Sequence, residues 1–285
     1  MILEETYTLS NGVELPKLGL GTWFIDDDVV AQAVCQAVEI GYRHIDTAQA
    51  YGNERGVGEG VRTAGVPREQ LFVTSKVAAE HKTYEEAARS IDATLELMGL
   101  DYLDLMIIHA PQPWDEWRGQ ARYFDENRAV WRALEDAYAA GKLRAIGVSN
   151  FLHDDLESLL EACEVRPMVN QVLAHVGNAP LELIAYCREQ GIQPESYSPI
   201  AHGRIAENPQ VADVAARYGI TCAQLCVRYA IQLGTAALPK ASSVEHMREN
   251  AAVDFAISDE DMAALSALSF ADYGEFSVFP VFSGK

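Results

Sequence analysis

The stretch Gly41–Gly58, GYRHIDTAQAYGNERGVG, contains the change from a strand to a helix that the rest of the chain repeats. Residues 43–45 are predicted to form a short strand, and a helical pattern begins near Glu54. Asp46 therefore lies where the predicted strand ends, and Tyr51 lies in the loop that follows. An acid and a phenol at the end of a strand indicate a site that handles protons.

The pattern of a strand followed by a helix occurs eight times. The predicted pairs are 17–21 with 29–40, 43–45 with 54–64, 71–75 with 84–98, 103–108 with 127–140, 145–148 with 155–162, 168–172 with 181–190, 193–197 with 211–218 and 221–233, and 236–238 with 244–250. No linker rich in Pro, Gly or Ser divides them, so we predict one domain over residues 1–285. Eight such units favour an α/β fold of the (β/α)8 TIM-barrel type over a doubly wound sheet.

Both ends of the chain are expected to add to this barrel. Residues 6–9 and 13–15 flank the pair Asn11-Gly12, which favours the positive φ angles of a type I′ turn, so we predict an N-terminal hairpin that covers one end. At the other end we predict an extra helix and a tail from Phe270 that contains five aromatic residues without helical spacing: Phe270, Tyr273, Phe276, Phe279 and Phe282. We expect an ordered loop or cover, with plain packing of the aromatic rings as the alternative.

The composition excludes several classes of function. The formal net charge of −20 opposes binding to nucleic acid or to an anionic membrane, because either partner needs a positive protein surface. The five cysteines form no CxxC pair, which indicates neither a disulfide framework nor a zinc site, and we expect no metal. No basic segment precedes an apolar run at the N-terminus. We predict a cytoplasmic monomer that acts on a small molecule.

Polar residues recur at the ends of the predicted strands, and in a barrel these ends meet at one mouth. They are Asp46, Lys76, His109, Ser149-Asn150, Gln171, Tyr197 and Lys240. The run Gly56-Val-Gly58-Glu-Gly60 has the wrong spacing for a dinucleotide-binding loop and lies at the start of a helix. Any nucleotide is therefore expected to bind without a Rossmann loop.

Several segments resemble the aldo-keto reductase superfamily, in that family's order and over nearly the whole chain. They are residues 41–58, Ser75-Lys76, 100–109, 141–151, Asn170-Gln171, 197–199, Pro239-Lys240 and Glu249-Asn250. Each segment alone is weak, whereas the set is specific. The resemblance implies a (β/α)8 barrel that binds NADP(H), uses no metal and reduces aldehydes or ketones to alcohols.

The resemblance also assigns residues to roles, position by position. The implied catalytic residues are Asp46, Tyr51, Lys76 and His109. The implied cofactor-binding residues are Gly21, Thr22, Trp23, Asp46, Ser149, Asn150, Gln171, Tyr197, Ser198, Ile200, Lys240, Ser242, Ser243, His246 and Asn250. The implied substrate-binding residues are Trp23, Tyr51, His109 and Trp114.

These residue types suit the chemistry of carbonyl reduction. Hydride delivery to a carbonyl carbon builds negative charge on its oxygen, which calls for a proton donor. Tyr51 would donate the proton, and a neighbouring Lys76 ammonium would lower its pKa from a usual value of about 10. Asp46 would hold Lys76 charged and in place. His109 would donate a hydrogen bond to the substrate oxygen and orient it.

The chain departs from the family's pattern in the walls of the pocket and at the expected phosphate site. Ala78, Ala79 and Ala110 stand where many members have larger side chains, which favours a roomier site. Lys240 is retained, but Ala241 and His246 stand where the family usually has a serine and an arginine for the 2′-phosphate. Histidine lacks the planar two-pronged donor geometry of arginine, so we predict that NAD(H) is accepted as well as NADP(H). A protonated His246 that still favours NADPH is the alternative.

Two other classes of function remain open from the sequence. A Schiff-base lyase or aldolase is also a barrel with a lysine at a strand end, and either Lys76 or Lys240 would serve. A cofactor-sensing barrel without catalysis is the second. Taken singly, Asp46, Tyr51 and His109 each have ordinary structural interpretations, and their joint placement is what favours a reductase.

Overall fold

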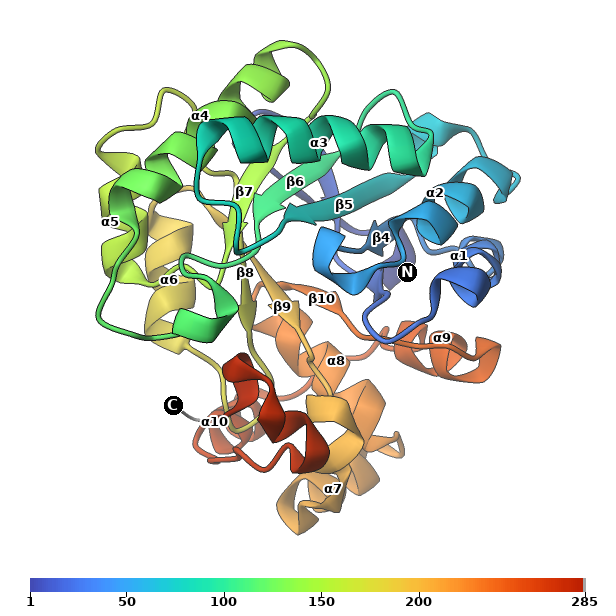
Figure 1. Cartoon of the computed structure of the whole chain (residues 1–285). Helices are drawn as coiled ribbons and strands as arrows, with labels where there is room; N and C mark the ends of the chain where they lie inside the picture. Colours follow the sequence, from blue (N-terminus) through green and yellow to red (C-terminus); the bar gives the residue numbers. More distant parts are fainter. Residues whose placement is uncertain (284–285) are drawn as a thin grey trace.

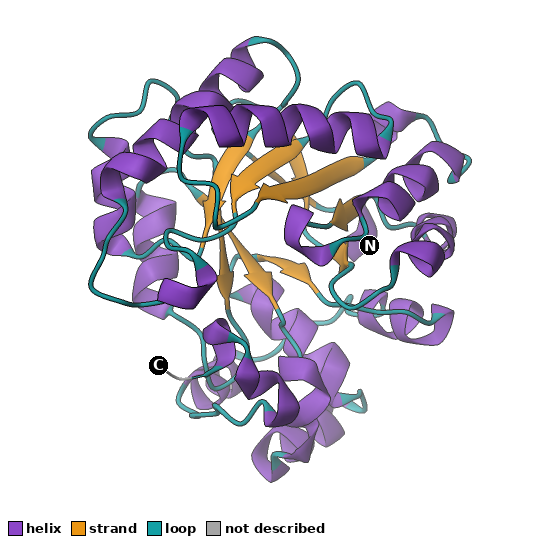
Figure 2. Cartoon of the chain, viewed as in Figure 1, coloured by secondary structure: helices purple, strands orange, loops and turns teal. Residues whose placement is uncertain are grey.

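Eight parallel strands form a barrel in the computed structural model, which describes residues 1–283. The strands lie side by side in sequence order from β3 to β10. Bridges from Leu18 to Ala237 and from Gly21 to Lys240 bring the first of these strands beside the last. Figure 2 shows the strands at the centre with helices around them. The predicted (β/α)8 barrel is confirmed.

The predicted elements differ from the observed ones by three residues or fewer at their ends. The barrel strands are β3 (Gly19–Gly21), β4 (His44–Asp46), β5 (Phe72–Val77), β6 (Leu105–Ile108), β7 (Ile146–Ser149), β8 (Val169–Leu173), β9 (Gln193–Tyr197) and β10 (Ala236–Leu238). The helices are α1 (Asp27–Ile40), α2 (Glu54–Thr63), α3 (Tyr84–Met98), α4 (Phe124–Ala139), α5 (His153–Leu160), α6 (Leu181–Glu189), α7 (Pro209–Tyr218), α8 (Cys222–Gln232), α9 (Val244–Ala251) and α10 (Asp259–Ser266).

Local capping explains where several helices begin. The Thr83 hydroxyl accepts a hydrogen bond from the Glu86 amide at the start of α3, and Thr221 forms a capping box with Gln224 at the start of α8. The strands, by contrast, are covered on both faces, and all six residues of β5 are buried. No helix of residues 1–283 is both long and apolar enough to cross a membrane.

The N-terminal hairpin is confirmed, but its predicted turn type is wrong. β1 (Thr6–Thr8) and β2 (Glu14–Pro16) pair antiparallel. A type I′ turn needs positive φ at both central residues, and here Gly12 has φ 85° while Asn11 has no positive φ. Asn11 instead accepts the Val13 amide and donates to the carbonyl of Arg144, just before β7. This contact holds the hairpin at the end of the barrel opposite the strand mouth.

The glycines of α2 serve close packing between helices. A Cβ added at Gly56 would clash with the Asp27 carbonyl of α1, and one at Gly58 would clash with the Met98 carbonyl at the end of α3. α2 therefore lies closer to both neighbours than any larger residue would permit. The glycines of residues 56–60, whose spacing does not match a dinucleotide-binding loop, therefore have a structural role in helix packing.

The C-terminal tail is an ordered cover, as expected. It contains the short 3-10 helices η6 (Gly274–Val278) and η7 (Pro280–Phe282), drawn in red in Figure 1. The Tyr273 hydroxyl lies 2.8 Å from Nε2 of His175 and accepts from Asn178 Nδ2 at 2.7 Å. Both partners follow β8, so these buried polar contacts fix the tail against the mouth of the barrel.

Candidate active site

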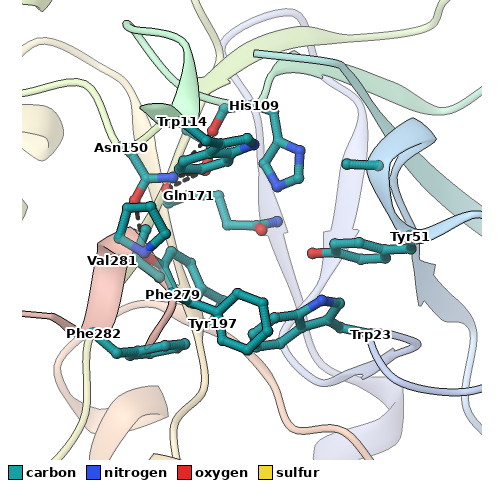
Figure 3. A pocket seen from close by; sticks show the side chains of 13 residues that line it. Trp23, Tyr51, His109, Trp114, Asn150, Gln171, Tyr197, Phe279, Val281 and Phe282 are labelled. Atoms are coloured by element: carbon teal, nitrogen blue, oxygen red, sulfur yellow. Dashed lines mark hydrogen bonds between the residues drawn. The ribbon is translucent and has the colours of Figure 1, made fainter. Parts of the chain in front are cut away.

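A cavity of about 280 Å³ opens at the carboxyl ends of the strands (Figure 3). Its lining consists of Trp23, Ala50, Tyr51, His109, Trp114, Ser149, Asn150, Gln171, Tyr197, Phe279, Pro280, Val281 and Phe282. A second cavity, of about 340 Å³, lies beside it and shares Trp23, Tyr51 and Tyr197 with it. The two cavities meet at these three aromatic side chains.

A buried ion pair lies beneath the mouth. Lys76 on β5 is fully buried, and its Nζ donates to Oδ1 of Asp46 at 2.6 Å and to the Thr47 carbonyl at 2.8 Å. Burial is the largest influence on the pKa of Lys76 and works to lower it, but charge and hydrogen bonding from Asp46 and Tyr51 together outweigh it and raise that pKa. The lysine is therefore charged, and its register beside β4 places it against the acid.

Tyr51 lies above this pair, at the end of the 3-10 turn η2 (Gln49–Tyr51). The Lys76 ammonium lies 4.9 Å from the centre of the Tyr51 ring. The expected effect of Lys76 in lowering the pKa of Tyr51 is present, but burial is larger and raises that pKa overall. The phenol thus holds its proton at neutral pH and is available as a donor.

His109 follows β6 and faces the same cavity as Tyr51, as Figure 3 shows. The centres of the two rings are 5.7 Å apart, and the Trp114 ring lies edge-on to His109 at 5.1 Å. Burial, together with the charge of Lys76, holds the pKa of His109 well below its usual value, so the imidazole is neutral. Its Nδ1 has no hydrogen-bond partner among residues 1–283.

Hydrogen bonds connect the ends of neighbouring strands along one wall of the cavity. Tyr197 donates to Oδ1 of Asn150 at 2.8 Å, and Nδ2 of Asn150 donates to the His109 carbonyl at 3.0 Å. The Ser149 hydroxyl donates to the Gln171 carbonyl at 2.8 Å. These bonds connect β6, β7, β8 and β9 at their ends, so the five residues are placed together as the sequence predicts.

Gln171 joins the ion pair to a second acid that the sequence analysis did not identify. Its Nε2 donates to Oδ2 of Asp46 and to Oε2 of Glu195, both at 2.9 Å. Glu195 on β9 is fully buried, and its Oε1 lies 4.0 Å from Nε2 of His44. Burial lowers the pKa of His44 to about 3, with Lys76 adding to the effect, so this contact is not an ion pair.

Burial raises the pKa of Glu195 to about 8, and the charge of Asp46 adds to the shift. At neutral pH Glu195 is therefore a protonated, neutral acid. Asp46 carries the negative charge that balances Lys76. A single glutamate within the strand Gln193–Tyr197 gives no sequence signal of this role, because its partners come from distant strands.

The implied cofactor residues divide into three groups. Those on the second cavity are Gly21, Trp23, Asp46, Tyr197, Ser198, Ile200 and Lys240, and those on the first are Trp23, Ser149, Asn150, Gln171 and Tyr197. The remainder, which line neither cavity, are Thr22, Ser242, Ser243, His246 and Asn250. Thr22 is buried and donates to the Asp46 carbonyl. Ser243 caps α9, on which His246 is exposed and Asn250 is buried.

The sequence analysis did not assign the tail residues of the lining to a site. Phe279 lies edge-on to Trp23 at 5.0 Å, and Phe276 stacks on His202 at 3.9 Å between ring centres. His202 lines the second cavity and lies in the loop after β9. The aromatic residues of the tail were the available signal, but nothing in their spacing indicates where the tail folds back.

The expectation of a roomier site rests on three alanines. Ala79 and Ala110 are fully buried, and none of Ala78, Ala79 and Ala110 lines either cavity. Trp114 does line the first cavity, as the substrate assignment requires. The expectation of a roomier site therefore stays a prediction.

A sequence model described as the aldo/keto reductase family matches residues 17–269. This chain belongs to that family. A glyoxal reductase of Bacillus subtilis is 42% identical over 269 residues, which is 94% of each chain. An uncharacterized oxidoreductase of the same organism, YtbE, is 42% identical over 273 residues, again 94% of each chain.

Solved structures of family members agree with the fold. The Bombyx mori aldo-keto reductase in complex with NADP is 30% identical, with a TM-score of 0.85 over 98% of each chain. An aldo-keto reductase from a deep-sea metagenome library is 36% identical, with a TM-score of 0.86 over 93% of this chain and 95% of its own. The resemblance of the sequence to the family is thereby confirmed.

We predict that Glu195→Gln removes a pH dependence from the stability. The folded protein holds the Glu195 proton up to about pH 8, whereas the unfolded chain releases it near the usual glutamate pKa of 4.5. The folded state binds more protons in this window, so wild-type stability falls as pH rises, by up to about 1.4 kcal/mol per pH unit. Chemical denaturation at pH 5, 6, 7 and 8 measures the slope.

Glutamine keeps the shape and the hydrogen-bonding capacity of the side chain without the ionisation. The control is Glu189→Gln, which removes an exposed carboxylate from α6 and should reproduce the wild-type slope. Equal slopes for wild type and Glu195→Gln would contradict a protonated Glu195.

Proposed function

We propose that this chain catalyses NADP(H)-dependent reduction of aldehydes or ketones to alcohols, with Tyr51 as the proton donor. The observation that carries the proposal is the meeting of Tyr51 and His109 in one cavity above the buried Asp46–Lys76 pair. Membership of the aldo/keto reductase family supports the reaction class. A relative named glyoxal reductase supports small aldehydes and dicarbonyls as the substrates to test first.

The two adjoining cavities fit an elongated dinucleotide. Lys240 lines the second cavity and offers an ammonium group for a phosphate, and Tyr197 borders both cavities and would face the nicotinamide. Ser149, Asn150 and Gln171 would hold the carboxamide from the first cavity. When bound, the nicotinamide supplies the hydride. The relative solved with NADP supports this choice of cofactor.

Tyr51 would transfer its hydroxyl proton to the substrate oxygen as the carbonyl carbon becomes reduced. The phenolate that remains is stabilised by the Lys76 ammonium, which Asp46 holds in place. His109, as a neutral imidazole, can donate one hydrogen bond to the same oxygen and fix the orientation of the carbonyl. The net change at the substrate is one new C–H bond and one new O–H bond.

An aldolase that uses Lys76 is disfavoured by the state of that lysine. A Schiff base requires a neutral amine with access to the substrate, whereas this lysine is buried, ion-paired and has a raised pKa. A barrel that only senses the cofactor would have no use for a protonated phenol beside an ammonium group. The reductase therefore accounts for more of the geometry than either alternative.

We predict that Tyr51→Phe lowers kcat by about 10²- to 10⁴-fold, because only the proton donor is removed. NADPH binding, measured by quenching of tryptophan fluorescence, should persist. Tyr84→Phe is the matched control, since that hydroxyl is exposed and bonds Asp136 on the outer helices. Activity of Tyr51→Phe within about threefold of wild type would contradict the assignment of Tyr51 as the proton donor.

We expect Lys76→Met to lower kcat at least as much as Tyr51→Phe, and also to destabilise the fold. The substitution leaves Asp46 charged and buried without its partner, which typically costs about 3–5 kcal/mol. The double variant Asp46→Asn with Lys76→Met removes both charges, so it should regain much of the stability and none of the activity. Activity restored in the double variant would assign Lys76 a structural role only.

We also expect the protein to use both NADH and NADPH. His246 is exposed near the start of α9, six residues after Lys240. We predict that wild type uses NADH and NADPH at comparable kcat/KM and that His246→Arg raises the NADPH preference by about ten- to a hundredfold, the value of one charged hydrogen bond. The control is His153→Arg, which adds the same charge at an exposed position of α5. A wild-type preference for NADPH above about a thousandfold, or an unchanged ratio in His246→Arg, refutes dual use.

A further inference from the structure

We infer that Arg118 binds the negative charge of an anionic substrate, so that the enzyme prefers aldehydes or ketones that carry a carboxylate. The inference rests on the proposed function and narrows its substrate class. Arg118 lies in the loop between β6 and α4, beside residues of the first cavity.

The guanidinium of Arg118 lies beside a residue that lines that cavity, although Arg118 itself is not part of the lining. Its Nη2 is 3.4 Å from the carbonyl oxygen of Asn150, a lining residue. Its guanidinium carbon lies 4.3 Å from the centre of the Trp117 ring, which packs on Trp114 at 5.3 Å between centres. Trp114 in turn contacts His109. Two tryptophans thus connect the cation to the residue that orients the carbonyl.

The backbone holds Arg118 in this place. Its φ is 56°, in the left-handed region that side chains other than glycine seldom adopt. Its amide donates to Oε1 of Gln112 at 2.9 Å, and Nε2 of the same glutamine donates to the carbonyls of Gly119 and Ala121. The buried Gln112 therefore fixes the loop on both sides of the arginine.

No carboxylate in residues 1–283 lies within 4.0 Å of the Arg118 guanidinium, although the chain has 42 acidic residues. Arg122, four residues later, pairs with both Asp154 and Asp155. Burial of the surrounding region is the largest influence on the pKa of Arg118 and lowers it, while the negative charge of Asp155 raises it; the residue itself is exposed. An exposed guanidinium with no carboxylate in direct contact is available to bind an anion.

The other cations of the site do not compete for that anion. Lys76 is neutralised by Asp46, and His109 is uncharged. Lys240 lines the second cavity, where a cofactor phosphate would engage it. A substrate that spans the cavity would place its carbonyl at Tyr51 and His109 and its carboxylate at Arg118. The opposing possibility is that Arg118 only supports Trp117 and the Asn150 carbonyl.

A matched pair of substrates separates these possibilities. 4-Carboxybenzaldehyde and 4-formylbenzamide have nearly the same shape and differ in charge. We expect wild type to prefer the acid by about tenfold or more in kcat/KM. Arg118→Leu should lower kcat/KM for the acid by about 10- to 100-fold, mainly through KM, because one charged hydrogen bond is lost, while the amide changes less than about threefold.

Two further variants test charge against shape. Arg118→Lys keeps the charge and should restore part of the preference for the acid, whereas Arg122→Leu removes an exposed, paired arginine of the same loop and should change neither substrate. Because 0.5 M NaCl screens an exposed charge, the wild-type ratio of acid to amide should also fall with salt, a test that needs no variant.

Failure of this inference can be distinguished from failure of the proposed function. If wild type reduces neither the acid nor the amide nor any other carbonyl with NADPH or NADH, the reductase assignment itself fails. If wild type reduces the amide without preferring the acid, or if Arg118→Leu lowers both substrates equally, the role of Arg118 is structural and the inference is overturned.

Discussion

The pair formed by Lys76 and Asp46 is the constraint on which the rest of the site depends. Two opposite charges buried 2.6 Å apart stay in place only if their remaining hydrogen-bonding positions are satisfied. Thr47 accepts from the lysine and Gln171 donates to the aspartate. Because these partners come from β4, its following loop and β8, the site exists only when the barrel has closed.

The neutrality of the surrounding groups follows from this arrangement. Glu195 lies near a carboxylate in a buried environment and therefore keeps its proton. His44 and His109 lie near an ammonium group in the same environment and therefore remain uncharged. One charge of each sign is balanced at the centre, and the titratable groups around it act as hydrogen-bonding groups.

The sequence was sufficient for the barrel and for the residues at its strand ends, because periodic patterns and strand termini are local features. Asp46, Lys76 and His109 each end or follow a strand and so could be placed without knowing any contact. Glu195 could not, because its effect depends on burial against Gln171, a residue on another strand. Likewise the turn at Asn11 depends on a contact with the Arg144 carbonyl, 133 positions away, which overrode the preference of the Asn-Gly pair.

The C-terminal tail contributes four residues to the cavity, yet none of its residues belongs to the barrel sheet. The Tyr273 hydroxyl is one of its polar anchors and bonds to His175 and Asn178 beyond the end of β8. Substrate shape and proton chemistry are thus encoded in separate parts of the chain. Natural variation or directed evolution confined to residues 276–282 can reshape the pocket wall while the strand ends that carry the proposed catalytic residues stay unaltered.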